Sequence, residues 1–178
     1  LEGWRGSRTP AVRRMAIGLV CVFVIRGTAA GIALVKPVAP INSALWNITA
    51  EMGETLREMV GWPDLAAQVA KIYATIPEDE KPRTVILAGN YGEAGALDLY
   101  GPEYGLPRVI SGGNSLWERG YGDPAPETAI VVGFDRSYAG RFFKSCDAAG
   151  FVQNRYNVKN EETTRHTGLY VCRQPRRP

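Results

Sequence analysis

The chain begins with a long apolar segment and continues as apolar runs separated by polar, glycine-rich turns. Residues 15–35 read MAIGLVCVFVIRGTAAGIALV, and a helix of this length spans about 30 Å, the thickness of a bilayer core. Arg26 interrupts the segment, at a cost of about 2.5–3.5 kcal/mol near the centre of a membrane helix. A transmembrane helix is our first interpretation, and a signal peptide and a buried helix of a soluble domain stay open as alternatives.

Positive charges flank this segment unequally. Only Lys36 follows it closely, whereas four arginines precede it, at Arg5, Arg8, Arg13 and Arg14. By the positive-inside rule we expect the N-terminus in the cytoplasm and the rest of the chain outside it. In this interpretation residues 1–14 are a basic flank, residues 36–61 a connector, and residues 62–174 an extracytoplasmic domain.

Residues 62–174 alternate between helical and strand-like patterns. Apolar residues at helical spacing predict a helix over 62–76, with a further helix over 93–100 and one from Asp135 to about Phe143. Short apolar runs predict strands over 84–88, 108–110, 128–133, 151–158 and 168–172. This order predicts an α/β domain, a small Rossmann-like open sheet with flanking helices, although the strand order is not readable from the sequence.

A glycine-rich turn, GNYGEAG, follows the first predicted strand and opens a helix. Backbone N–H groups at such a turn can hold an anion such as phosphate, which makes Asn90, Tyr91 and Glu93 candidate ligand-binding residues. The turn lacks the Gly-Lys-Ser/Thr ending of a P-loop and the spacing of a dinucleotide-binding GxGxxG motif. Glu93 is also a candidate acid/base residue, but a carboxylate that matches the helix dipole explains it more simply.

A long polar loop, residues 112–126, follows the second predicted strand, and long ordered loops tend to carry function. Trp117 and Tyr121 can stack on a sugar ring or a lipid, with Asn114 and Ser115 forming hydrogen bonds to it. In the alternative interpretation Trp117 folds back to cover the sheet. Neither the turn nor the loop holds a self-sufficient catalytic site, so no catalytic residue is predicted.

The cysteine and histidine content limits the chemistry further. The chain has three cysteines and one histidine, too few and too scattered for a structural zinc site. His166 lies in a polar run, which favours a surface histidine over a catalytic one. Outside the cytoplasm Cys146 and Cys172 can form a disulfide worth about 3.5 kcal/mol, and two unpaired buried thiols are the alternative.

The charge pattern excludes a further class of partner. The net charge is +3, and the basic excess lies at the two ends while the middle is close to neutral. A nucleic-acid-binding protein carries its positive charge as a patch or stripe on one face. No nucleic acid is therefore expected as a partner.

Five segments carry a family resemblance: Gly61–Pro63, Val85–Gly101, Tyr104–Trp117, Ile130–Asp135 and Phe142–Cys146. Together they resemble the C-terminal extracytoplasmic domain of bacterial family 39 glycosyltransferases. These are multi-spanning membrane enzymes similar to protein O-mannosyltransferases and to the aminoarabinose lipid A transferase. In this comparison residues 15–35 match the last membrane helix before that domain, in the cell membrane.

The resemblance implies a part in moving a sugar from a polyprenyl-phosphate donor to a lipid or protein acceptor outside the cytoplasm. The family's catalytic acidic residue lies in a loop between N-terminal membrane helices that this sequence does not contain. No catalytic residue, metal or cofactor is therefore expected here, and this chain alone is expected to transfer no sugar. The implied partners are the remaining membrane helices of the transferase, membrane lipid, and a sugar or polyprenyl-phosphate ligand.

Two other functions stay open. One is an independent membrane-anchored α/β module for binding or interaction. The other, weaker, is a small soluble α/β enzyme or nucleotide binder in which residues 15–35 are buried.

Overall fold

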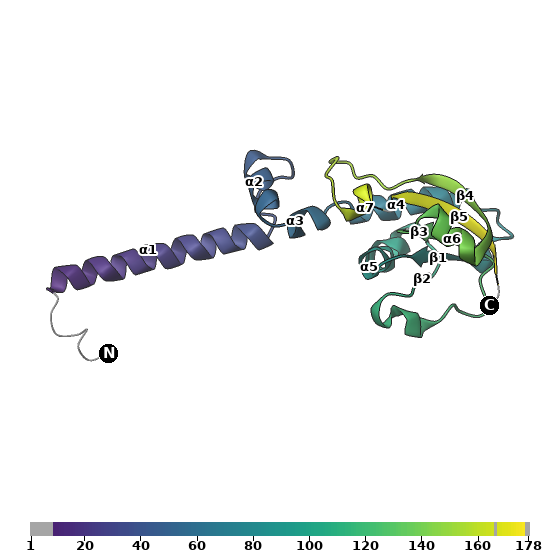
Figure 1. The fold of residues 1–178 in the computed structure, drawn as a ribbon, viewed down its shortest axis with the longest axis horizontal. Coiled ribbons are helices and arrows are strands. Elements are labelled where there is room, and N and C mark those ends of the chain that lie inside the picture. Colours follow the sequence, from purple (N-terminus) through teal and green to yellow (C-terminus); the bar gives the residue numbers. More distant parts are fainter. Residues whose placement is uncertain (1–8, 166, 177–178) are drawn as a thin grey trace. The chain divides into compact units, whose positions relative to one another are not determined.

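The computed structural model describes residues 9–165 and 167–176 (Figure 1). The chain divides into two compact units, Leu1–Leu56 and Arg57–Pro178. His166, for which a surface position is expected, lies outside the described residues, as do Arg5 and Arg8 of the basic flank. Each unit is described by itself below.

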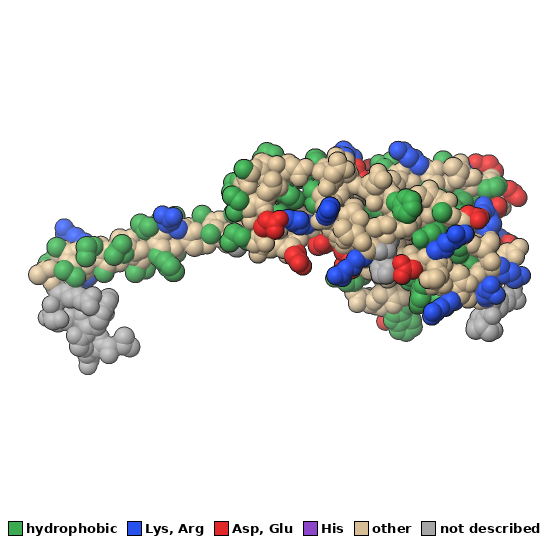
Figure 2. Space-filling model, turned by 45° about the horizontal axis from the view of Figure 1, so that its top comes forward, with side chains coloured by type: hydrophobic (Ala, Val, Ile, Leu, Met, Phe, Trp, Pro, Cys, Tyr) green, Lys and Arg blue, Asp and Glu red, His purple; other side chains and the backbone are tan. Residues whose placement is uncertain are grey.

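The first unit is dominated by the helix α1 (Pro10–Val35), which starts with a proline, as helices commonly do. Its Pro10–Ala33 stretch is long and apolar enough to cross a membrane, and none of the most apolar part is buried. Hydrophobic side chains are spaced along the length of α1, with a few basic side chains among them (Figure 2). The expected connector contains a second helix, α2 (Ala44–Met52), in which Trp46 is buried as a packing residue.

The second unit contains an open five-stranded sheet. Its strands are β1 (Thr84–Ala88), β2 (Val109–Ser111), β3 (Thr128–Val132), β4 (Phe143–Phe151) and β5 (Gly168–Pro175). The order across the sheet is β2-β1-β3-β5-β4. β1 runs parallel to β2 and β3, whereas β5 is antiparallel to β3 and to β4. The predicted fold class, a small Rossmann-like open sheet with flanking helices, is confirmed.

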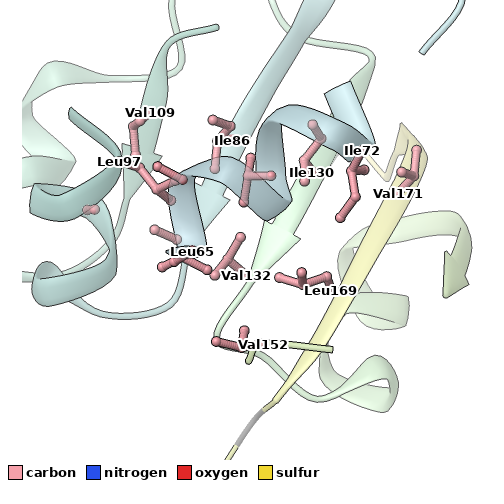
Figure 3. Close-up of a cluster of buried hydrophobic side chains, with 14 of the residues drawn as sticks. Leu65, Ile72, Ile86, Leu97, Val109, Ile130, Val132, Val152, Leu169 and Val171 are labelled. Atoms are coloured by element: carbon pink, nitrogen blue, oxygen red, sulfur yellow. The ribbon is translucent and has the colours of Figure 1, made fainter. Parts of the chain in front are cut away.

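Helices cover both faces of this sheet. The helices of the second unit are α4 (Trp62–Ala74), α5 (Tyr91–Tyr100), α6 (Arg136–Phe142) and α7 (Glu161–Thr164), and the short α3 (Thr55–Glu58) precedes them. Leu65 of α4 and Leu97 of α5 pack with Ile86 and Ile130 of the sheet (Figure 3). Ala139 of α6 packs on the opposite face. Three-residue and longer 3₁₀ turns complete the unit at η2 (Lys81–Arg83), η3 (Gly101–Tyr104) and η4 (Asn114–Arg119).

One predicted strand is misplaced. The fourth strand is β4, Phe143–Phe151, and the prediction of a strand over 151–158 is wrong. Val152, Asn154 and Val158 are buried, which gives this segment its strand-like alternation. The side chain of Asn154, however, bonds to the backbone of Val158, replacing the contacts that a neighbouring strand would supply. β4 itself lies at the edge of the sheet, where most of its residues, apolar ones included, are exposed, so no regular apolar alternation marks the strand.

A disulfide joins the last two strands of the sheet. Cys146 on β4 lies directly opposite Cys172 on β5, and their sulfur atoms are bonded. Cys172 is fully buried in the core on the α6 face. The bridge therefore fixes the edge strand β4 to the sheet. The remaining cysteine, Cys21, is unpaired and exposed on α1.

Candidate functional site

The carboxyl ends of β1 and β3 form the place where open α/β sheets most often bind ligands. After β1 the chain crosses to β2 on one side of it, and then returns to β3 on the other side. Ligands of such sheets bind in the crevice at this reversal, outside the strand ends. Gly89 follows β1 and Gly133 follows β3, so the glycine-rich turn predicted from the sequence lies at this crevice.

The turn after β1 is closed by hydrogen bonds within the chain. The backbone N–H of Glu93 donates to Oδ1 of Asn90 over 2.8 Å, which caps the start of α5. In return, one carboxylate oxygen of Glu93 accepts the N–H groups of Gly89 and Asn90, at 3.0 and 3.1 Å. This reciprocal arrangement is a capping box.

Glu93 consequently occupies the position of an external anion. Its side chain is 3% exposed, and its Oε2 takes the N–H groups that a phosphate would use at a helix N-terminus. Gly133 is what makes room for it, since a Cβ there would lie 2.0 Å from that oxygen. Gly89 likewise approaches the Gly133 carbonyl too closely for any side chain. The crevice between β1 and β3 is therefore filled by the chain's own carboxylate.

The loop after β2 runs beside this turn. A Cβ on Gly113 would lie 3.4 Å from the N atom of Tyr91, so the start of the loop touches the start of α5. The 3₁₀ turn η4 follows, and an ion pair between Arg119 and Asp98 ties its end to α5. The structure therefore places Asn114, Ser115 and Trp117 on a turn that is attached to the helix carrying Tyr91.

The aromatic residues of these two segments are exposed. Tyr91 and Trp117 are 66% and 65% exposed. It is Leu116, and not Trp117, that packs against the hydrophobic core, so the interpretation in which Trp117 covers the sheet is wrong. The indole and phenol rings are accessible to a ligand or a partner, as tryptophan and tyrosine are at binding surfaces.

A second polar group at the same end of the domain was missed by sequence reasoning. It lies where the start of α4 meets the segment between β4 and β5. The Asn160 side chain donates to the Val60 carbonyl over 2.9 Å, and the side chain of Asn154 accepts N–H groups of Tyr156 and Val158. These asparagines are distant from Val60 in sequence, and no local pattern signals their approach.

Glu162 on α7 is the most unusual member of this group. It is 8% exposed, and its Oε2 has no hydrogen-bond partner among the described residues. Burial raises the pKa of Glu162 to about 7, and the negative charges of Glu58, Glu93 and Glu161 act in the same direction. A buried carboxyl with a pKa near neutral, close to further carboxylates, is a feature typical of functional sites.

In the described part of the chain, no three metal-binding side chains of the His, Cys, Asp or Glu type come together. Comparison of the chain with protein-family models, with curated proteins and with solved structures finds no match. The fold and this edge define a small open α/β domain in which a carboxylate of the chain itself accepts the backbone N–H groups after β1. An apolar helix precedes this domain in the sequence. The function of the chain is argued from these features.

Proposed function

We propose that the chain is a membrane-anchored accessory domain of a glycosyltransferase that takes its sugar from a polyprenyl-phosphate donor. The α/β domain works outside the cytoplasm and α1 holds it at the membrane. The observation that carries this proposal is the disulfide between Cys146 and Cys172, because such bonds persist in oxidising compartments. The apolar, unburied surface of α1 supports the membrane anchor.

The proposed role is recognition and support, without catalysis. Glu93 fills the crevice of the sheet, and its oxygen is engaged by two backbone N–H groups, which disfavours a bound nucleotide phosphate there. The exposed rings of Tyr91 and Trp117 offer stacking surfaces for a sugar or a partner protein. The resemblance of five segments to the C-terminal domain of family 39 glycosyltransferases supplies the class of reaction.

The location is tested by protease digestion of the full chain in its native membrane. In spheroplasts the α/β domain should be digested from outside, whereas in inverted vesicles it should be protected. Alkylation before reduction should label Cys21 alone. Alkylation after reduction should label all three cysteines. Protection in spheroplasts, or labelling of Cys146 without reduction, would contradict the proposal.

The activity is tested in two steps. The purified chain should transfer no sugar from a polyprenyl-phosphate donor, and turnover by it would refute the accessory role. Removal of the α/β domain in the cell should reduce sugar transfer to an extracytoplasmic lipid or protein. If transfer is unchanged, while Trp117→Ala abolishes binding to another partner, the domain is an independent binding module. The exposure of Trp117 is the observation that favours that second candidate.

A further inference from the structure

A small cavity lies beside Glu162 in the second unit, with a volume of about 10 Å³. It is lined by the start of α4, by residues that follow β4, and by α7. A cavity of this size holds one water-sized group and no more. Trp62, Asn154, Asn160 and Thr163 contribute to its wall together with Glu162.

The cavity contains a hydrogen-bond acceptor that the described chain does not satisfy. Among the described residues, none forms a hydrogen bond with Oε2 of Glu162, and Glu162 is only 8% exposed. A buried polar atom of this kind costs free energy until a donor reaches it. A ligand that places a donor in the cavity therefore forms a hydrogen bond to Oε2 of Glu162 that the described chain does not make.

The surroundings favour a donor with a positive charge. Glu58 of α3, Glu93 of α5 and Glu161 of α7 all act on Glu162 with their negative charges. The cavity wall includes no lysine or arginine among the described residues. Arg155, in the segment after β4, is engaged by Asp64 of α4, with 2.7 Å between its Nε and the carboxylate Oδ1. The charged side chains that act on Glu162 are carboxylates.

We propose that this cavity binds a primary ammonium group, which donates a hydrogen bond to Oε2 of Glu162. An ammonium nitrogen is about as large as a water molecule and carries three donors. Asn154, Asn160 and Thr163 line the cavity as well, but their side-chain oxygen atoms already take part in hydrogen bonds within the chain, so Oε2 of Glu162 is the acceptor proposed for the ammonium group. A neutral hydroxyl group would satisfy the hydrogen bond but not the charge, and a quaternary ammonium would exceed the volume.

The carboxylates around the cavity also determine which chemical groups the ligand can carry next to its amine. The four carboxyl groups repel a phosphate, so the ligand is an amine without a neighbouring anion, such as the side chain of a lysine. A phosphoethanolamine headgroup is disfavoured for the same reason. This inference uses none of the residues of the loop that carries Trp117, and it does not rest on the proposed role in sugar transfer.

The test uses the full chain in detergent micelles, with the indole N–H signal of Trp62 as the reporter. Methylammonium should shift this NMR signal in a saturable way, whereas tetramethylammonium and methanol should not. Nα-acetyl-lysine amide, whose side-chain ammonium group is free, should bind. Phosphoethanolamine should bind at least about tenfold more weakly. Saturation by methanol, or equal affinity for phosphoethanolamine, would overturn the proposal.

The variants separate this site from general attraction to acidic surfaces. Glu162→Gln should weaken methylammonium binding at least about tenfold, while Glu161→Gln, which removes an exposed neighbouring carboxylate, should change it less than about threefold. Equal weakening by both variants would refute a site at Glu162. If Glu162→Gln does not fold, the ¹³C shift of the Glu162 carboxyl in the unmodified chain decides, since it must follow the same titration as Trp62.

Discussion

Gly133 packs so closely against Glu93 that it leaves no room for a side chain: a Cβ on Gly133 would lie 2.0 Å from Oε2 of Glu93. The backbone at Gly133 also has φ of +76°, a conformation that favours glycine. This contact joins the end of β3 to the start of α5. It decides that the crevice of the sheet is closed by the chain itself.

Replacing Gly133 should destabilise the domain. Gly133→Ala places a methyl group against the Glu93 carboxylate and strains the backbone, so we expect a loss of about 2–4 kcal/mol in the free energy of unfolding. Gly95→Ala is the matched control, because Gly95 lies in α5 and a Cβ added there would have no atom within 4 Å. That variant should gain about 0.5–1 kcal/mol. Urea unfolding followed by circular dichroism measures both.

Removing Glu93 should expose an anion site. Glu93→Ala leaves the N–H groups of Gly89 and Asn90 without their acceptor, which should cost about 2–4 kcal/mol of stability. Phosphate should restore part of this loss in the variant and leave the unmodified chain unchanged. The exposed Glu103→Ala should change stability by less than about 0.5 kcal/mol. Thermal unfolding with and without phosphate gives the answer, and an equal response of both proteins would contradict it.

Stability should fall as the pH rises toward neutrality. Burial raises the pKa of Glu162 from 4.5 to about 7, so the unfolded chain loses this proton first. The stability that this shift provides is full below about pH 4.5 and is lost as the pH rises to about 7. Glu162→Gln should remove this dependence and be more stable by about 3 kcal/mol at pH 8, at about 1.4 kcal/mol per pKa unit. Urea unfolding at pH 5 and pH 8 tests this.

The carboxyl groups of Glu80 and Asp64 have lowered pKa values, so they affect the pH dependence of stability in the opposite direction to Glu162 and at lower pH. The hydrogen bond from Arg173 lowers the pKa of Glu80, and bonds from Arg155 outweigh burial to lower the pKa of Asp64. Their contributions are present above the ordinary carboxyl pKa and are lost only in more acidic solution. A stability curve between pH 5 and 8 that is the same for Glu162→Gln and the unmodified chain would therefore disprove the assignment to Glu162.

Reduction of the disulfide should destabilise the sheet edge. Cys146 and Cys172 are separated by 26 residues, for which loop-closure entropy gives about 3.5 kcal/mol. Double replacement by alanine should lower the free energy of unfolding by about that amount, and β4 should show faster hydrogen exchange than β1. Cys21→Ser, on α1, should have no effect on the α/β domain.

The two neighbouring residues Leu116 and Trp117 should separate stability from binding. Leu116 packs on the core, so Leu116→Ala should cost about 1–2 kcal/mol of stability. Trp117 is exposed, so Trp117→Ala should change stability by less than about 0.5 kcal/mol while reducing any binding to a sugar or partner. A large loss of stability in Trp117→Ala would mean that this ring has a packing role.

The local elements of this protein follow largely from its sequence. The runs that predict β1 and β3 are apolar and rich in β-branched residues because both strands are buried on both faces. The sequence misplaces β4 because this strand lies at the sheet edge, where its buried residues are Phe143 and Cys146 and most of the others are exposed, so no regular apolar alternation marks it. The capping partner Asn90 lies three residues from Glu93, so its role also lies within reach of local reasoning.

By itself the sequence determined an apolar helix of membrane-spanning length and an α/β domain with a glycine-rich turn after its first strand. These depend on periodicity and on contacts within a few residues. Only the tertiary structure decided that Gly133 accommodates Glu93, that Cys146 pairs with Cys172, and that Glu162 faces a cavity without a partner among the described residues. Each of these joins residues that are distant in the chain, and their proximity is fixed by the strand order, which no local pattern encodes.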